Sequence, residues 1–306
     1  MYTQIIVPLD GSEFAEQVLP YALALAPALG SEVQLVRAVQ GAPPAGFATQ
    51  TQHERFWASA RSNALTEAEG YLKKASARLE QAGVKVAYDA VEGPPAGVIV
   101  EAAESVPQSL IAMTTHGRSG PGRWLFGSVA DRVLHTTTRP LLAIRSRKET
   151  GATATASVRR IVLPLDGSEL AETAVPHAVA VAKALHAGIT AVQCVTSVAY
   201  AYGAGYLPPA DAQTMDDEAE ASARAYLEKA VTSLRAQGVN DVDSRMLSGQ
   251  AAESIVDFAR SVPDHLVVLA THGWSGITRA MMGSVAGRLV RHSEGPVLIV
   301  PPRDVR

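Results

Sequence analysis

The sequence predicts an α/β protein made of two tandem doubly wound parallel-sheet sandwiches, each Rossmann-like with the strand order 3-2-1-4-5. Three observations support this prediction. The chain repeats its motifs at one constant spacing, each copy alternates short β-branched runs with longer alanine-rich runs, and 47% of the residues are hydrophobic, which is enough to build buried cores. Right-handed crossovers between parallel strands restrict such a chain to the doubly wound topology.

The internal repeat defines two domains. All its motifs keep the 156-residue spacing that separates Asp10 from Asp166. They are Ile6–Glu13 with Val162–Glu169, Ser105–Pro107 with Ser261–Pro263, Thr115–Gly117 with Thr271–Gly273, and Gly127–Ala130 with Gly283–Ala286. Because solenoid repeats are only about 20 to 50 residues long, this is a duplicated domain. We predict domains at 1–148 and 158–306, joined by a small, polar linker at 149–157.

The elements of the first copy follow from its alternating composition. Apolar, β-branched runs predict strands near Gln4–Leu9, Glu32–Ala38, Lys85–Val91, Ser109–Thr114 and Leu141–Arg145. The stretches between them predict helices near Glu13–Ala28, Glu54–Gln81, Pro95–Ser105 and Ser128–Thr137. Continuously apolar strands indicate a sheet covered on both faces. After the second strand of each copy, Gly41–His53 and Ser197–Met215 are rich in Gly, Pro and Ala, and we predict exposed, mobile loops there.

Charge and composition argue against several classes of protein. The net charge of −3 provides no overall basic field that would gather nucleic acid or an anionic membrane. The single cysteine, Cys194, can form neither an intrachain disulfide nor a CxxC pair. The sequence shows no run of about 18 apolar residues and no readable secretory signal. We therefore expect a cytoplasmic protein with neither nucleic-acid nor membrane partners.

The best-matching motifs converge on one crevice in each copy. In an open parallel sheet, ligands bind beyond the carboxyl ends of the strands, where the strand order reverses. With the order 3-2-1-4-5, that point lies between the first and fourth strands. Pro8–Ser12 leaves the first strand and Thr114–Ser128 leaves the fourth. The sequence therefore predicts a ligand site at this point.

The loop after the fourth strand has the composition of an anion site. Glycines allow a ligand to approach the backbone closely, and the N–H groups of a helix start, with a hydroxyl in the first turn, form a cradle for phosphate. The alternative is a tight turn in which Ser128 and Ser284 are ordinary helix N-caps. Recurrence of the loop in both copies, beside an aspartate loop, favours the anion site.

Aspartate and histidine residues complete the candidate site. Asp10 and Asp166 can accept hydrogen bonds from ribose hydroxyls or adenine; alternatively, the Asp-Gly-Ser turn only caps the first helix. His116 and His272 can donate to a phosphate, or they simply order the turn.

Other familiar motifs do not fit. Gly122–Ser128 resembles the start of a P-loop, but Ser128 stands where lysine is required. Gly117–Gly120 lacks the spacing of a hydrolase nucleophile elbow. The histidines and the lone cysteine show no metal-ligand spacing. Nothing predicts a protein-bound metal, although a bound triphosphate would bring Mg²⁺.

At these residues the chain resembles the universal stress protein family, specifically its tandem members. The family's nucleotide loop reads Gly-x2-Gly-x9-Gly-(Ser/Thr), and the chain matches its second part from Gly117 to Ser128 and from Gly273 to Ser284. Thr114 and Ala270 replace the first glycine, and each adds a Cβ near the ligand. The Pro-x-Asp-x-Ser start also matches, and the resemblance spans nearly all of both copies.

The resemblance implies a site for ATP, ADP or AMP in each copy, with Mg²⁺ held by the phosphates. The aspartates would hold the ribose or adenine, the second strand would contact adenine, and the glycine loop would hold the phosphates. The implied residues are Pro8, Asp10, Ala38, His116, Gly117, Gly127, Ser128 and Val129 in the first copy, and Pro164, Asp166, Cys194, His272, Gly273, Gly283, Ser284 and Val285 in the second.

The resemblance also implies pairing of domains through the fifth strand. Pro140–Ile144 and Pro296–Val300 suit this role, because proline is tolerated as the first residue of an edge strand and the apolar run invites pairing. The two copies would then form a pseudo-dimer within one chain, and a homodimer of chains is compatible with the same surface.

The expected function is that of a stress-response protein that senses or sequesters ATP. We identify no general base, nucleophile or metal cluster, so we expect slow ATP hydrolysis at most. One alternative is a scaffold that binds no nucleotide and recruits partners through the fifth strands. Another is a small-molecule enzyme with a catalytic group at one crevice only, for which the pairs Arg118 with Trp274 and Asp131 with Gly287 are the asymmetries to inspect.

Overall fold

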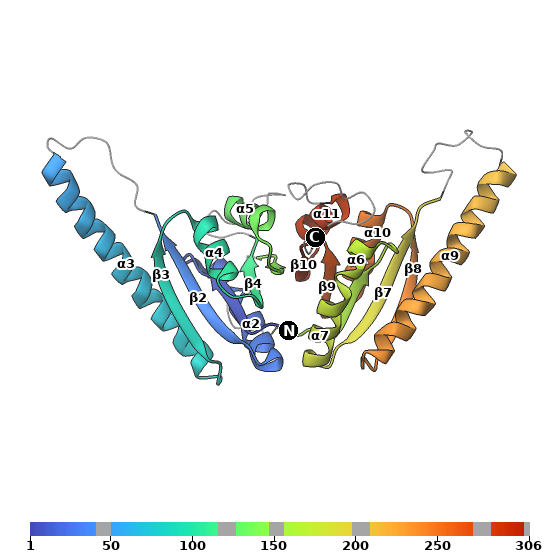
Figure 1. Ribbon diagram of the computed structural model, residues 1–306, viewed down its shortest axis with the longest axis horizontal. Coiled ribbons are helices and arrows are strands. Elements are labelled where there is room, and N and C mark those ends of the chain that lie inside the picture. The colour runs from blue at the N-terminus through green and yellow to red at the C-terminus, as the bar shows by residue number, and fades with distance from the viewer. Residues whose placement is uncertain (41–49, 116–126, 147–155, 198–208, 272–282, 303–306) are drawn as a thin grey trace. The chain divides into compact units, whose positions relative to one another are not determined.

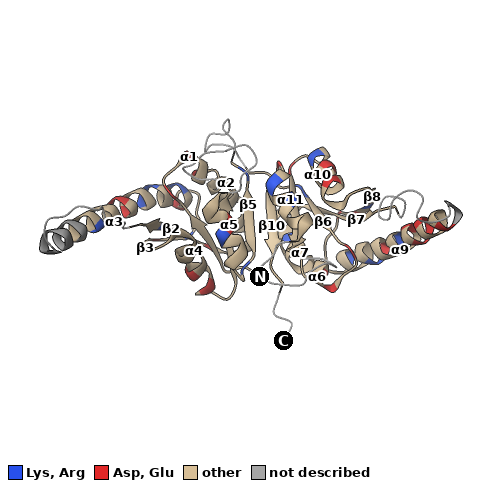
Figure 2. Cartoon of the chain, turned by 90° about the horizontal axis from the view of Figure 1, so that it is seen from above, with Lys and Arg blue, Asp and Glu red and all other residues tan. Residues whose placement is uncertain are grey.

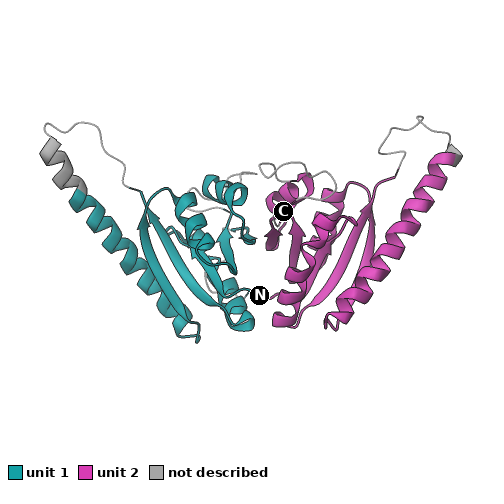
Figure 3. Cartoon of the chain, in the orientation of Figure 1, with its two compact units in different colours: residues 1–156 teal, residues 157–306 magenta. Residues whose placement is uncertain are grey.

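The computed structural model describes residues 1–40, 50–115, 127–146, 156–197, 209–271 and 283–302 (Figure 1). Its contacts separate the chain into two compact units, Met1–Ala156 and Ser157–Arg306 (Figure 3). Most of the linker that we predict at 149–157 lies outside the described residues.

Unit 1 contains a parallel five-stranded sheet in the order β3-β2-β1-β4-β5. The strands are β1 (Gln4–Pro8), β2 (Glu32–Val39), β3 (Val86–Glu92), β4 (Ser109–Thr114) and β5 (Leu141–Ile144). Gln4 of β1 pairs with Glu32 on one side and with Ser109 on the other. The predicted fold class and strand order are therefore confirmed, with strand ends within one residue of the prediction.

The helices of unit 1 cover both faces of this sheet. They are α1 (Glu13–Glu16), α2 (Leu19–Leu29), α3 (Gln50–Glu80), α4 (Pro95–Glu104) and α5 (Ser128–Thr136). The long helix α3 packs against β2 and β3, while α4 packs against the central strands and against α5. Every residue of β4 and β5 is buried, as expected for strands covered on both faces.

Unit 2 repeats this architecture in the order β8-β7-β6-β9-β10. Its strands are β6 (Arg160–Pro164), β7 (Gly188–Val195), β8 (Val242–Ser248), β9 (His265–Ala270) and β10 (Val297–Val300). Its helices are α6 (Glu169–Glu172), α7 (Val175–Leu185), α9 (Pro209–Ala236), α10 (Ala251–Ser261) and α11 (Ser284–His292).

The first predicted helix is wrong in one respect. Glu13–Ala28 does not form a single helix, because α1 ends at Glu16 and α2 begins at Leu19. Pro20 lies in the first turn of α2, and its missing N–H cannot bond the Glu16 carbonyl that a continuous helix would offer it. In unit 2, Pro176 lies at the same place in α7 and separates it from α6.

The predicted loops after the second strands are too long. Of Gly41–His53, the residues from Gln50 onward belong to α3, and of Ser197–Met215, the residues from Pro209 onward belong to α9. Alanine is the strongest helix former, and proline is tolerated in the first turn of a helix, so these residue types do not by themselves indicate a loop. Residues 41–49 and 198–208 lie outside the described residues.

Both long helices are polar. Lys, Arg, Asp and Glu residues are distributed along α3 and α9 (Figure 2). In the described part of the chain, no helix combines the length and the apolar character needed to span a membrane.

Candidate functional site

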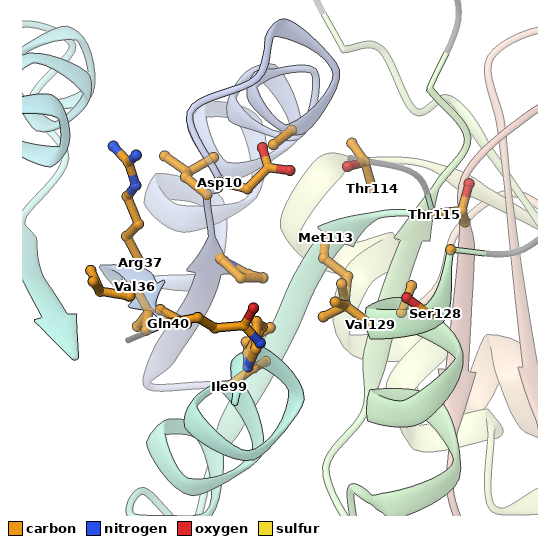
Figure 4. Close-up of a pocket in the computed structure, with 18 of the residues that line it drawn as sticks. Asp10, Val36, Arg37, Gln40, Ile99, Met113, Thr114, Thr115, Ser128 and Val129 are labelled. Atoms are coloured by element: carbon orange, nitrogen blue, oxygen red, sulfur yellow. The ribbon is translucent and has the colours of Figure 1, made fainter. Parts of the chain in front are cut away.

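A cavity of about 640 Å³ opens at the carboxyl ends of β1, β2 and β4 in unit 1 (Figure 4). Asp10 comes from the end of β1, Val36–Gln40 from the end of β2, and Met113–Thr115 from the end of β4. The first turn of α5 closes one side, and α1, α3 and α4 contribute further described walls. The cavity therefore lies at the point where the strand order reverses, as predicted for a doubly wound sheet.

The first turn of α5 faces this cavity. Gly127 caps the helix with an extended backbone, its carbonyl accepts from the Asp131 N–H at 2.9 Å, and its own N–H donates to the Thr115 carbonyl at 2.8 Å. Ser128, Val129 and Ala130 line the cavity as the first three helical residues. N–H groups at these positions have no acceptor within a helix, so the positive end of the helix dipole points to the cavity.

The alternative in which Ser128 and Ser284 are N-caps is wrong. Gly127 caps α5 and Gly283 caps α11, and both serines are the first residues of their helices. Their hydroxyls are therefore not used as caps, because a cap must stand outside the first turn to accept from its N–H groups.

Asp10 both orders a turn and lines the cavity. Its Oδ1 accepts from the Ser12 N–H at 2.9 Å and from the Ser12 hydroxyl at 2.6 Å, and the Ser12 hydroxyl in turn accepts from the Ala15 N–H at the start of α1. In unit 2, Asp166 and Ser168 make the same bonds, at 3.0 and 2.6 Å. The capping turn and the ligand role are thus compatible, since the turn fixes the carboxylate at the cavity.

Behind each aspartate, a tyrosine ties the long helix to the first short helix. The Tyr71 hydroxyl donates to Glu16 at 3.0 Å in unit 1, and the Tyr226 hydroxyl donates to Glu172 at 3.0 Å in unit 2. Burial, the neighbouring glutamate and the nearby site aspartate all raise the pKa of each tyrosine above its ordinary value of 10.0. Both hydroxyls are therefore held in the protonated, donating form.

These tyrosines predict a loss of stability at alkaline pH. Their folded pKa exceeds the unfolded one, so the folded state binds more protons, and the stability they contribute is complete below pH 10.0 and is lost as the pH rises above it. Urea unfolding at stepped pH should show the free energy of unfolding falling less steeply in Tyr71→Phe and Tyr226→Phe. Equal slopes in the wild type and in both variants would contradict the assignment.

Unit 2 has a smaller cavity at the same place, of about 230 Å³. Cys194 lines it from β7, and its thiol donates to the Gly249 carbonyl at 3.2 Å. Burial raises the pKa of this thiol, so it is held protonated and weakly reactive near neutral pH.

Most of the predicted site residues lie around these two cavities. The unit 1 cavity is lined by Pro8, Asp10, Ala38, Gly127, Ser128 and Val129, and the unit 2 cavity by Pro164, Asp166, Cys194, Gly283, Ser284 and Val285. His116, Gly117, His272 and Gly273 lie outside the described residues, as do Arg118 and Trp274. Asp131 is not among the described walls of the unit 1 cavity, so its exchange for Gly287 marks no difference in those walls.

Sequence reasoning missed several walls of the unit 1 cavity. Arg37 precedes the predicted Ala38 on β2, Gln40 follows the end of that strand, Glu67 comes from α3, and Ile99 comes from α4. The prediction at the end of the second strand came from the family resemblance and selected Ala38 alone, so it did not consider the neighbouring side chains. Glu67 and Ile99 gave no local signal, because only the packing of α3 and α4 brings them to the strand ends. Among the described residues, no group of three or more His, Cys, Asp or Glu side chains could hold a metal ion.

The fold and the crevices define a class: a tandem, doubly wound α/β protein with a helix start and an aspartate turn at the cavity of each unit. The sequence model of the universal stress protein family matches residues 1–145 and 157–301, and the chain belongs to this family. The predicted resemblance is thereby confirmed.

Similar proteins agree with this assignment. A universal stress protein of Methanocaldococcus jannaschii is 33% identical over 149 residues, which cover 49% of this chain and 85% of the relative. One from Mycolicibacterium smegmatis is 25% identical over 225 residues, covering 73% of this chain and 71% of the relative. The crystal structure of a universal stress protein from Archaeoglobus fulgidus has the same fold, with a TM-score of 0.69, 20% identity, and coverage of 97% of this chain and 98% of that one.

Proposed function

We propose that this universal stress protein binds an adenine nucleotide at the crevice of each unit and acts in stress response as a nucleotide sensor or binder. One observation carries the proposal: a fixed carboxylate, Asp10, and the open first turn of α5 share one cavity at the reversal of strand order. A volume of about 640 Å³ suits a small-molecule ligand, since such pockets measure roughly 300 to 1,000 Å³.

The chemistry of the walls supports a nucleotide in one orientation. The N–H groups at the start of α5 and the Ser128 hydroxyl would hold the phosphates, with any Mg²⁺ carried by those phosphates. Asp10 would accept from the ribose hydroxyls or the base. Val36, Ile99 and Met113 offer apolar surface for the flat base.

The proposed activity is binding, with slow ATP hydrolysis at most. Asp10 Oδ1 is engaged by the Ser12 N–H and hydroxyl, which suits a fixed acceptor better than a base that exchanges protons. From the family resemblance we also propose that β5 and β10 serve as pairing strands, within the chain or between chains. A cytoplasmic location is a separate proposal, which follows the expectation from the composition of the sequence.

Mass spectrometry and calorimetry test the proposal. The purified protein is denatured, any released nucleotide is identified by mass, and ATP and AMP are titrated into the emptied, refolded protein. We expect two sites per chain. No released nucleotide and no heat up to millimolar ATP, with folding verified by circular dichroism, would overturn the proposal.

Enlarging the two cap glycines should abolish binding. Gly127 has φ −62° and Gly283 has φ −55°, which any residue adopts, so Gly127→Val and Gly283→Val should fold. Each added side chain lies at the rim of a cavity where phosphate is expected to approach the backbone. In calorimetric titrations, each single variant should lose one site and the double variant both; unchanged titrations in folded variants would contradict this placement.

A further inference from the structure

The two units differ in charge at the end of the second strand. Arg37 follows Val36, the residue of β2 that pairs with Pro8, and Gln193 follows Val192, the residue of β7 that pairs with Pro164. Arg37 and Gln193 therefore occupy the same register. Around them, the aspartate turn, the glycine cap and the Tyr–Glu hydrogen bond recur in both units. The replacement of arginine in unit 1 by glutamine in unit 2 is therefore a difference in charge between two sites whose neighbouring contacts are otherwise repeated.

Arg37 is a largely buried cation on the wall of the unit 1 cavity. Only 11% of its side chain is exposed, and its guanidinium carbon lies 5.0 Å from the centre of the Tyr71 ring. Its Nη2 is 3.6 Å from a Glu67 carboxylate whose side chain is 79% exposed. Figure 4 shows Arg37 and Ser128 on opposite sides of the cavity view. Water screens the exposed carboxylate more than the buried cation, so the cation retains attraction for an incoming anion.

The described walls of the unit 2 cavity include no arginine or lysine, and this cavity is smaller. Gln193 lies between two described wall residues, Val192 and Cys194, and its Oε1 is buried with no hydrogen-bond partner in the described part of the chain. At this register an amide therefore replaces the cation of unit 1. The unit 1 cavity extends to Ala64 and Glu67 of α3, whereas the described walls of the unit 2 cavity include no residue of α9. Cys194, in place of Ala38, also adds a sulfur to the wall.

We propose that the two nucleotide sites of the chain are unequal, that unit 1 holds the tighter one, and that Arg37, across the cavity from the start of α5, raises the affinity of this site for a polyanionic nucleotide by long-range electrostatic attraction. This inference rests on the proposed function. ATP carries several negative charges and adenosine none, so a charge effect acts on ATP and spares adenosine. A cation held away from water attracts such a ligand more strongly than a solvated one does.

Reciprocal substitutions test this assignment. ATP and adenosine are titrated calorimetrically into the wild-type chain, Arg37→Gln and Gln193→Arg. We expect two classes of ATP site in the wild type, a loss of about tenfold in the tighter class in Arg37→Gln, and a gain of similar size in the weaker class in Gln193→Arg. Adenosine affinities should change much less. Arg37→Gln should fold, because the Glu67 carboxylate that it leaves is mostly in water.

The alkylation of Cys194 shows which class of ATP site belongs to which unit. This residue is the single cysteine of the chain and lines the unit 2 cavity, so protection of Cys194 from alkylation at mildly alkaline pH reports ATP in unit 2 alone. We expect protection to follow the weaker class. Arg37→Lys, which keeps the charge without the planar contact to Tyr71, should retain most of the ATP preference.

The outcomes separate this inference from the proposed function. Protection of Cys194 at the tighter class, two equal sites, or equal losses of ATP and adenosine in Arg37→Gln would each overturn the role of Arg37 while leaving nucleotide binding intact. Absence of ATP binding by the folded wild type would overturn the proposed function and this inference with it.

Discussion

Ser128→Glu is expected to abolish nucleotide binding at the unit 1 cavity while leaving the unit folded. Ser128 is the first residue of α5 and is exposed at the cavity. A carboxylate there would occupy the N–H groups proposed for phosphate and would repel the phosphate itself, so ATP affinity should fall by about a hundredfold or more. The same carboxylate interacts favourably with the helix dipole and should raise the free energy of unfolding by about 0.3–1 kcal/mol.

Ser128→Glu is informative because it should lower the affinity for ATP while raising the free energy of unfolding. Calorimetry measures ATP affinity, and urea unfolding measures stability. Ser128→Gln has nearly the same size as the glutamate variant without its charge, and should lose much less affinity. Ser284→Glu should act in the same way on unit 2. If Ser128→Glu still bound ATP like the wild type, the phosphates could not lie at the start of α5.

Gly295→Ala is expected to destabilise unit 2 by about 1–3 kcal/mol, the usual cost of overpacking a filled site. A Cβ at Gly295 would lie 2.5 Å from His265 Nε2 and 3.0 Å from two ring carbons. The ring cannot easily move away, because it is 9% exposed and its Nδ1 donates to the Val262 carbonyl at 2.7 Å. Urea unfolding measures the effect.

Unit 1 supplies the compensating substitution. Unit 1 has Ser109 on β4 where unit 2 has His265 on β9, and it has Arg139 where unit 2 has Gly295. In unit 1, a small residue on the fourth strand is therefore combined with a large residue just before the fifth strand. Adding His265→Ser to Gly295→Ala should therefore remove the clash, and the double-mutant cycle should show coupling. Gly70→Ala in α3 is the control. Its Cβ meets no atom within 4 Å, so it should stabilise by about 0.5–1 kcal/mol. Additive effects of the two unit 2 substitutions would contradict the steric explanation.

Local pattern was sufficient for the sheet and for one part of the site. Apolar β-branched runs identified all five strands of unit 1 within one residue at their ends. Burial on both faces explains the apolar runs of β1, β4 and β5, whereas the edge strand β3 alternates half-buried with exposed residues along most of its length. The aspartate turn and the glycine cap were found from their spacing, since both lie at strand ends that the topology brings together.

The same reasoning failed where two local preferences compete. Pro20 interrupts a run that reads as one helix, because proline is acceptable in the first turn of a helix but not in the interior of a continuing helix. Residues from Gln50 and from Pro209 onward are helical although the Gly, Pro and Ala content of these segments suggested loops. The composition of a segment does not show where a loop ends and a helix begins, because it combines residues whose conformational preferences differ.

By itself, the sequence determined the duplication, the doubly wound fold, the family and the two aspartate–glycine crevices, because each depends on short motifs and on the periodicity of apolar residues. Only the tertiary structure decided that the crevices are unequal. Arg37 becomes a buried cation through Tyr71 and Glu67, which belong to a helix about 30 residues further along the chain, and the unit 1 cavity extends under that helix. Burial and the resulting electrostatic strength arise from long-range packing, which no local pattern contains.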